Sequence, residues 1–207
     1  SGFALKDSTF QGEAGDDRFF NYGANTENVT MFGDAGSDWW INQAAAGSSH
    51  NLRFLAGTDD GSADVFINWA ANVSDVIFEG GGGNDLLQNG GLNSSGFTST
   101  GGDGNDLLLN IGYGATQFLF NAGNGDDTFE NRGRSGGSLR MLGGAGDDAF
   151  YQNAGDALDI ELDGGDGNDT LLNFSSNMGR VALIGGTGTD ILQNSGNDIG
   201  SLEVTGG

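Results

Sequence analysis

The stretch GGDGNDLLL (residues 101–109) decides the fold, because it returns along the chain at a fixed interval. Equivalent aspartates recur nine times and are mostly 21 residues apart, with one interval of 26. A period this regular is typical of solenoids, in which each repeat stacks on the next. The repeated aspartates are Asp17, Asp38, Asp64, Asp85, Asp106, Asp127, Asp148, Asp169 and Asp190. We count them as coils one to nine and number positions within a coil from the aspartate as 0.

A short strand is expected directly after each aspartate. By strand alternation, side chains at +2 and +4 point the same way, and we expect that way to be inward. Position +2 is always large and apolar, and +4 is asparagine except in coil seven, where Gln152 stands at +4 and Asn153 at +5. That departure predicts a β-bulge. We expect the buried asparagines to form a ladder of stacked amides along the axis.

A second strand is expected before each glycine turn, with inward apolar residues at −9 and −7, for example Val76 and Phe78. Two strands per coil predict an all-β fold: a parallel β-helix or β-roll solenoid of about nine 21-residue coils with two short strands each. The repeat runs from near residue 10 to the last residue. We therefore expect residues 1–207 to form a single β-solenoid domain.

Composition narrows the function. The formal net charge is −22, from 29 acidic residues against seven Lys and Arg, and this charge argues against nucleic-acid binding. The chain has no cysteine, which excludes disulfides and thiolate metal sites. It also has no apolar run of membrane-spanning length, so we expect no membrane insertion. Charge at this density repels itself unless cations lie among the carboxylates.

The turn motif resembles the calcium-binding repeat of the RTX (repeats-in-toxin, hemolysin-type) family, Gly-Gly-x-Gly-x-Asp-x-apolar-x. Segments that match at every defined position include GGGGNDLLQ (80–88), GGDGNDLLL (101–109), GGDGNDTLL (164–172) and GGTGTDILQ (185–193). Typical members of that family place a motif at both corners of each coil, whereas here the opposite corner, such as NRGRSGGS (131–138), has no aspartate turn. This one-sided variant looks like the solenoid region of some giant bacterial adhesins, including an ice-binding one.

The resemblance implies that Ca²⁺ lies between successive turns along one edge, at about eight sites. Calcium prefers six to eight oxygen ligands, which carboxylates and backbone carbonyls can supply. Eight divalent ions would add sixteen charges and bring −22 to about −6, an ordinary value for a soluble domain. The alternative is a set of structural Asx turns without metal. The expected metal ligands are the nine repeated aspartates together with Gly80, Gly101, Gly143, Gly164 and Gly185.

Coil three departs from the repeat. Its turn GTDDGSAD (57–64) reads as two residues longer, and the segment from Gln43 to Ala56 reads as three residues longer. Asp59 or Asp60 could replace the usual ligand there, or the site could be empty. The only histidine, His50, is expected in this loop, where solvation is a better interpretation than catalysis.

The predicted function is a calcium-stiffened structural or adhesive module of a secreted or cell-surface bacterial protein, and hence extracellular. Ice binding is the alternative, although the outward −3 column mixes alanine, aspartate, asparagine and threonine instead of forming a threonine array. A polysaccharide-active enzyme is a remote alternative. One histidine, one lysine and three scattered tyrosines form no catalytic constellation, so we do not expect an enzyme.

Two kinds of self-association are predicted. The first and last segments, SGFALKDSTF and EVTGG, read like the repeat, which favours end-to-end stacking into a filament. The outward positions +1 and +3 are unusually apolar and predict lateral association through this sheet face. In coils two to five the stripe consists of Trp39, Ile41, Val65, Ile67, Leu86, Leu107 and Leu109.

Overall fold

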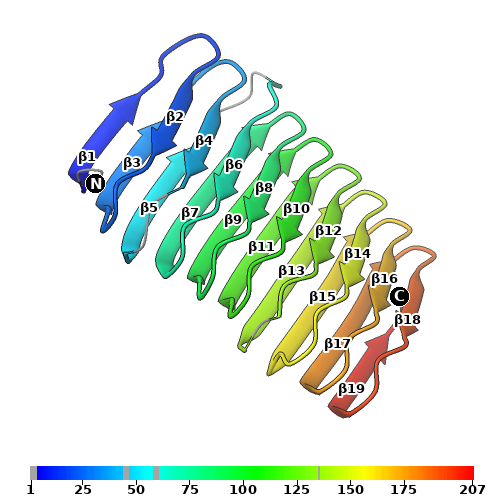
Figure 1. Cartoon of the computed structure of the whole chain (residues 1–207). Helices are drawn as coiled ribbons and strands as arrows, with labels where there is room; N and C mark the ends of the chain where they lie inside the picture. The colour runs from blue at the N-terminus through cyan, green and yellow to red at the C-terminus, as the bar shows by residue number, and fades with distance from the viewer. Residues whose placement is uncertain (1–3, 44–46, 58–60, 135) are drawn as a thin grey trace.

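The computed structural model describes residues 4–43, 47–57, 61–134 and 136–207. Within these ranges every regular element is a β-strand, and no helix is long and apolar enough to cross a membrane. The coils lie side by side in one row, from the blue amino-terminal end to the red carboxy-terminal end of Figure 1. The prediction of an all-β solenoid of about nine stacked 21-residue coils is confirmed.

Two parallel sheets form the solenoid. The ten-stranded sheet takes every odd-numbered strand in chain order and the nine-stranded sheet every even-numbered strand. The first sheet consists of β1 (Lys6–Gln11), β3 (Glu27–Phe32), β5 (Ser49–Leu55), β7 (Val73–Gly82), β9 (Ser95–Asp103), β11 (Thr116–Asn124), β13 (Ser138–Ala145), β15 (Asp159–Asp166), β17 (Met178–Thr187) and β19 (Ile199–Thr205). The second consists of β2 (Arg18–Asn21), β4 (Trp39–Asn42), β6 (Val65–Asn68), β8 (Leu86–Asn89), β10 (Leu107–Asn110), β12 (Thr128–Asn131), β14 (Ala149–Gln152), β16 (Thr170–Asn173) and β18 (Ile191–Asn194).

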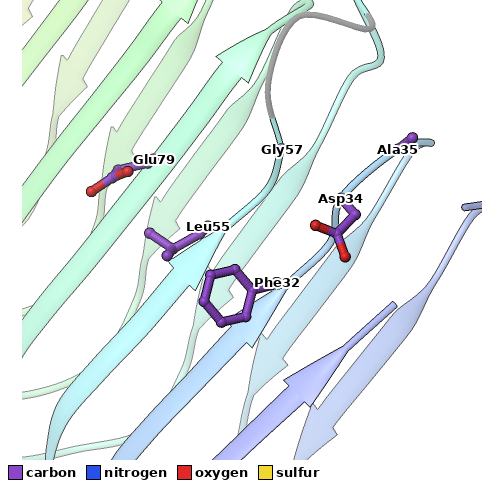
Figure 2. A pocket seen from close by; sticks show the side chains of 6 residues that line it. All are labelled: Phe32, Asp34, Ala35, Leu55, Gly57 and Glu79. Carbon is purple, nitrogen blue, oxygen red and sulfur yellow. The ribbon is translucent and has the colours of Figure 1, made fainter. Parts of the chain in front are cut away.

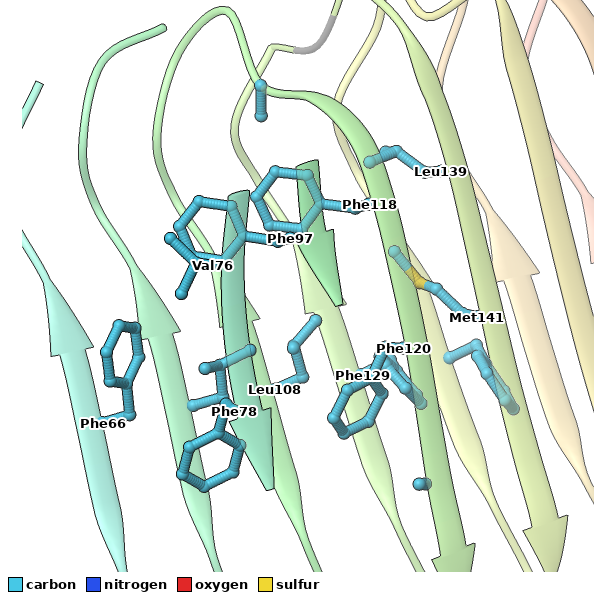
Figure 3. Close-up of a cluster of buried hydrophobic side chains, with 14 of the residues drawn as sticks. Phe66, Val76, Phe78, Phe97, Leu108, Phe118, Phe120, Phe129, Leu139 and Met141 are labelled. Atoms are coloured by element: carbon cyan, nitrogen blue, oxygen red, sulfur yellow. The ribbon is translucent and has the colours of Figure 1, made fainter. Parts of the chain in front are cut away.

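The core lies between the two sheets, as the alternation predicts. Residues at +2, such as Phe66 and Leu108, and residues at −9 and −7, such as Val76 and Phe78, are buried in one hydrophobic cluster (Figure 3). Aromatic rings from neighbouring coils stack inside it, with the centroids of Phe129 and Phe150 4.9 Å apart. Each coil therefore buries its apolar side chains partly against the coils beside it.

The asparagine ladder is also confirmed. Asn89 donates from Nδ2 to Oδ1 of Asn110 at 2.9 Å, and Asn110 donates in turn to Asn131 at 2.8 Å, all three being buried. Gln152 pairs in register with Asn131 and accepts its amide at 2.8 Å, so the bulge expected in coil seven is wrong. The longer glutamine side chain continues the ladder to this point, and its own Nε2 donates to the carbonyl oxygen of Ala154 instead of the next coil.

Two expectations about the glycine turns need correction. The strands before them are not short in most coils, because β7 and β17 extend for ten residues and include the first glycines of the motif. Gly81 and Gly102 pair as strand residues. In coil three, Phe32 pairs with Leu55, an offset of 23, whereas Asp38 and Asp64 differ by 26. Two extra residues thus precede β5 and three follow it, the reverse of the expected division.

We predict that Asn110→Ala destabilises the solenoid by about 2–4 kcal/mol, because it removes the buried partners of both Asn89 and Asn131. Urea denaturation in calcium-containing buffer would measure this loss. Asn121→Ala, at an exposed position of β11, is the control and should change stability by less than about 0.5 kcal/mol. Equal small effects from the two substitutions would contradict the ladder's role.

Candidate metal edge

The repeated aspartates form one column along the edge where the ten-stranded sheet turns into the nine-stranded sheet. Seven of the nine are buried, and the first and last, Asp17 and Asp190, are half-buried. Each carboxylate is therefore taken out of water beside the carboxylates of the neighbouring coils. We call this column the aspartate edge. Its members are Asp17, Asp38, Asp64, Asp85, Asp106, Asp127, Asp148, Asp169 and Asp190.

One oxygen of each carboxylate, Oδ1, accepts a hydrogen bond that joins its coil to the preceding coil. Oδ1 of Asp127 accepts a hydrogen bond from the backbone N–H of Asp106 in the preceding coil at 2.7 Å, and Oδ1 of Asp148 accepts from the N–H of Asp127 at 2.8 Å. The same bond joins every pair of consecutive aspartates from Asp17 to Asp190. An anionic acceptor makes these bonds stronger than neutral ones.

The other oxygen, Oδ2, points back over the glycine at −5. A Cβ placed on Gly101 would lie 1.9 Å from Oδ2 of Asp106, so glycine gives the carboxylate room. Coil six has the buried Ala122 at this position, which shows that one coil accommodates a methyl group. The structure thus brings the predicted aspartates and the predicted glycines together. The same contact occurs at Gly80, Gly101, Gly143, Gly164 and Gly185.

In several coils Oδ2 is buried without a hydrogen-bond donor. Within the described part of the chain this holds for Asp17, Asp106, Asp127, Asp148 and Asp169. A buried carboxylate oxygen without a donor is costly, and a cation or a proton would remove that cost. These oxygens are the main observation that fits calcium at this edge.

Backbone carbonyls run along the same edge. A Cβ on Gly104 would lie 1.9 Å from the carbonyl oxygen of Gly83, and one on Gly125 would lie 2.1 Å from that of Gly104. The glycine at −2 therefore has a carbonyl from the preceding coil directly against it. Carbonyl and carboxylate oxygens are the ligands that calcium prefers. Among the described residues, however, no group of three or more His, Cys, Asp or Glu side chains converges. A site here would therefore rely mainly on carbonyls.

Sequence reasoning missed the part played by position −1. Oδ1 of Asn84 accepts from the backbone N–H of Asn105 at 2.8 Å, and Oδ1 of Asp126 accepts from the N–H of Asp147 at 2.9 Å. In these bonds the side chain accepts from the backbone of the following coil, whereas each carboxylate of the aspartate edge accepts from the backbone of the preceding coil. The recurring Asn and Asp at −1 was the available signal, since such side chains commonly bond to nearby turn backbone.

The opposite corner has its own regular feature. Position −13 adopts a positive φ in most coils, at Asn72 (55°), Asn93 (54°) and Asn177 (60°). Asparagine tolerates this left-handed conformation better than most residues do. Among the described residues, this corner is therefore a column of turns at asparagine, glycine and the exposed Asp156 (68°), without a row of buried aspartates like the aspartate edge.

Burial alters the acidity of the column. Desolvation raises the pKa of Asp106 and Asp148 to about 7 and that of Asp127 to about 6, and hydrogen bonds from neighbouring backbone only partly oppose the shift. The pKa of Asp169 is raised for the same reason. Without metal, the folded chain therefore holds protons on these groups at higher pH than an ordinary aspartate does.

Coil three and His50 fall outside this pattern. Asp59 and Asp60, named as replacement ligands, lie outside the described residues. His50 lies in β5, not in a loop, and its Nε2 is 3.2 Å from Oε1 of Glu27, whose Oε2 accepts a hydrogen bond from Lys6 at 2.9 Å. A polar contact with Glu27 on the sheet surface accounts for the histidine.

An open cavity of about 420 Å³ lies beside coil three, on the outer face of the ten-stranded sheet (Figure 2). Phe32 and Leu55 form its apolar wall, while Asp34 and Glu79 contribute carboxylates. Glu79 is 3.9 Å from Arg53. The six lining residues include no side chain of the kind that acts as a hydroxyl or thiol nucleophile.

The sequence matches no protein-family model, and comparisons with curated proteins and with solved structures likewise find no match.

We predict that Gly102→Ala costs about 2 kcal/mol or more. The residue has a φ of +124°, and a Cβ there would lie 1.9 Å from the carbonyl oxygen of Gly81. Urea denaturation would measure the loss. Gly136→Ala, where no atom lies within 4 Å of the added Cβ, is the control and should be nearly neutral. A neutral Gly102→Ala would show that the coils can separate at this edge.

We also predict that the chain without divalent cations becomes less stable as pH rises. With pKa values of about 6 to 7 in the folded state against an ordinary value near 4, the folded state binds more protons between these limits. The stability penalty is absent below about pH 4, grows up to about pH 7 and is then constant. Circular dichroism melts in chelator from pH 4.5 to 8.5 would show it. Asp106→Asn with Asp148→Asn should flatten the dependence, and stability that rises with pH would contradict the prediction.

Proposed function

We propose that this chain is a calcium-stiffened structural or adhesive module of a secreted or cell-surface bacterial protein, with calcium bound along the aspartate edge. The observation that carries the proposal is the row of buried Oδ2 oxygens without donors, for example in Asp106, Asp127 and Asp148. The resemblance of the turn motif to RTX repeats supports the same conclusion. A typical ion would bridge consecutive coils, with about eight such positions along the edge.

Calcium would supply positive charge and accept several oxygen ligands at once. The chain's residues would supply the carboxylates of the aspartate edge and the glycine carbonyls, such as those of Gly83 and Gly104. The Oδ1 bonds to the preceding coil already orient each carboxylate, so Oδ2 is the oxygen left for the ion. Binding to the folded state alone stabilises it by mass action.

The proposed role is mechanical. Nine coils at about 4.8 Å give a rod on the order of 40 Å long. Its stability would depend on calcium at concentrations of about 10⁻⁴ to 10⁻³ M, as is usual for extracellular modules. The rod would therefore fold and stiffen outside the cell. Ice binding is not proposed, because the exposed −3 column pairs unlike side chains, such as Asp103 with Asn124 and Asp166 with Thr187.

The first test is calcium dependence. In chelator at pH 7.5 the chain should lose most of its β-sheet circular dichroism, because the buried carboxylates repel one another and lack a counter-charge. Added calcium should restore the signal with a midpoint near 10⁻⁴ to 10⁻³ M, whereas magnesium, which demands a tighter octahedral shell, should do so poorly. An unchanged spectrum and melting temperature across chelator and calcium would refute the proposal.

A substitution in the column tests the site itself. Asp106→Asn keeps an Oδ1 acceptor for the N–H of Asp85 but removes the charge, so the calcium midpoint should rise several-fold. Asp75→Asn removes one charge at an exposed position of β7 and should leave the midpoint unchanged.

The same pair separates metal binding from a structural role without metal. In chelator, Asp106→Asn should be at least as folded as the parent chain, since a buried charge has been removed. If Asp106→Asn destabilises the chain equally with and without calcium, the carboxylate serves only the stacking, and the calcium proposal is wrong.

A further inference from the structure

The outer surface of the nine-stranded sheet is a continuous apolar face. The strands alternate as predicted, with +2 and +4 buried and +1 and +3 outward. Position +5 adds further rings, including Trp69 and Phe174, each 45% exposed. We call this surface the apolar sheet face. Its large exposed members are Phe20, Tyr22, Trp39, Trp69, Leu107, Tyr151, Phe174 and Ile191, and its half-buried members include Ile41, Val65, Ile67, Leu86, Leu109 and Leu172.

Charge is nearly absent from this face. Nine strands with two outward positions each give eighteen positions at +1 and +3, and Arg18 and Glu130 are the only charged residues among them. Arg18 is exposed and lies over the ring of Trp39 at 5.7 Å, and Glu130 forms an ion pair with Arg132, the charged residue at +5 of the same coil, at 2.5 and 2.8 Å. The molecule as a whole carries −22, so this is the surface at which a second copy would meet least repulsion.

The other sheet differs in this respect. Its outer surface carries ion pairs between coils, including Lys6 with Glu27, Arg140 with Glu161 and Arg180 with Glu203. These charges are satisfied within one chain and remain solvated at the surface. Burying them against a partner would cost desolvation energy. The difference singles out the nine-stranded sheet as the one suited to a dry contact.

The face is also regular enough to meet a copy of itself. Its strands pair in register without offset, for example Trp39 with Val65 and Leu86 with Leu107. The ring of Trp69 lies against Gly90 of the next coil, where an added Cβ would come within 2.2 Å of it. Packed sheets interdigitate at about 10 Å, and a surface with a 4.8 Å period matches along its length only a surface of the same period.

The available area suffices for a stable dimer. Nine strands at about 4.8 Å and five residues at about 3.3 Å describe a face of roughly 700 Å² per copy. Two copies would bury about 1,400 Å², within the range of specific interfaces. The rows of leucine and isoleucine offer few hydrogen bonds, which suits another apolar sheet better than a hydroxyl-rich polysaccharide.

We propose that two copies of this chain pair through their apolar sheet faces, so that two solenoids form a four-layered sandwich. The pairing leaves the aspartate edge of each copy at the side, and the contact uses no residue of that edge, so calcium would affect it only through the folding of each copy. Folding is therefore monitored by circular dichroism in every sample. A failure of calcium dependence and a failure of pairing give separate results.

Sedimentation equilibrium over about 1–200 µM, a range of roughly two-hundredfold, in calcium-containing buffer tests the pairing. The parent chain should approach the dimer mass. Ile41→Lys with Ile67→Lys and Leu109→Lys, three outward positions, should give a monomer, with association weakened by about 100-fold or more. Thr98→Lys with Thr100→Lys and Leu119→Lys, on the exposed face of the other sheet, makes the same charge change and should leave the dimer intact.

Several results would overturn the proposal. One is a parent chain that stays monomeric at the highest concentration, and another is an equal loss of association in both triple variants. A third is a series of ever larger oligomers that the first variant leaves unchanged, which would indicate end-to-end stacking. If the first variant does not fold, Leu107→Lys with Ile191→Lys replaces it, since these side chains are 39% and 59% exposed. A monomeric parent chain that binds crystalline cellulose or chitin through the same residues would replace the second copy with a polysaccharide partner.

Discussion

The hydrogen bond from a backbone N–H to the carboxylate of the next coil is the constraint on which the structure depends. It fixes the stacking of consecutive turns at one point per coil, and it requires the carboxylate to enter the interior. The glycines at −5 and −4 follow from that requirement, because the first leaves space for Oδ2 and the second allows the close approach of the preceding carbonyl. The same bond is made across the 26-residue interval from Asp38 to Asp64, so this polar interaction fixes the stacking even where the coil is longer.

The fold could be predicted because the same residue pattern recurs in nine coils, so each coil supports the assignment of the others. Phe66 or Asn89 alone would indicate little, but the recurrence of large apolar residues at +2 and asparagine at +4 identified both the inward face and the ladder, and the structure confirms each. The same regularity explains one error. Gln152 was taken for a displaced asparagine, although its longer amide reaches the ladder position with the backbone in register.

Other features could not be predicted, because they depend on which backbone groups of neighbouring coils pair and on where the turn side chains point. The division of the insertion around β5 follows from the pairing of Phe32 with Leu55, and no residue pattern marks that pairing. The aspartates and glycines of the candidate site were identified from spacing. Their burial, the backbone donors to Oδ1 and the buried Oδ2 of residues such as Asp148 follow from the direction of the side chain at the turn. Position −1 was overlooked because aspartate and asparagine, which accept the same bond, read as an irregular column.

The aspartate edge and the apolar sheet face differ in charge, although both belong to the same coil. The edge concentrates negative charge where it is hardest to neutralise, and the pKa of Asp106, raised to about 7, reflects that cost. The apolar sheet face carries almost no charge and would favour contact under any ionic condition. The two meet within four residues, since Leu107 and Leu109 follow Asp106 directly. A cation at the edge would fix the strand that follows it, and an ordered row of such strands is what makes the apolar face flat. Stiffness along the rod and a surface regular enough for lateral pairing would then have one physical origin, the neutralisation of a buried carboxylate in every coil.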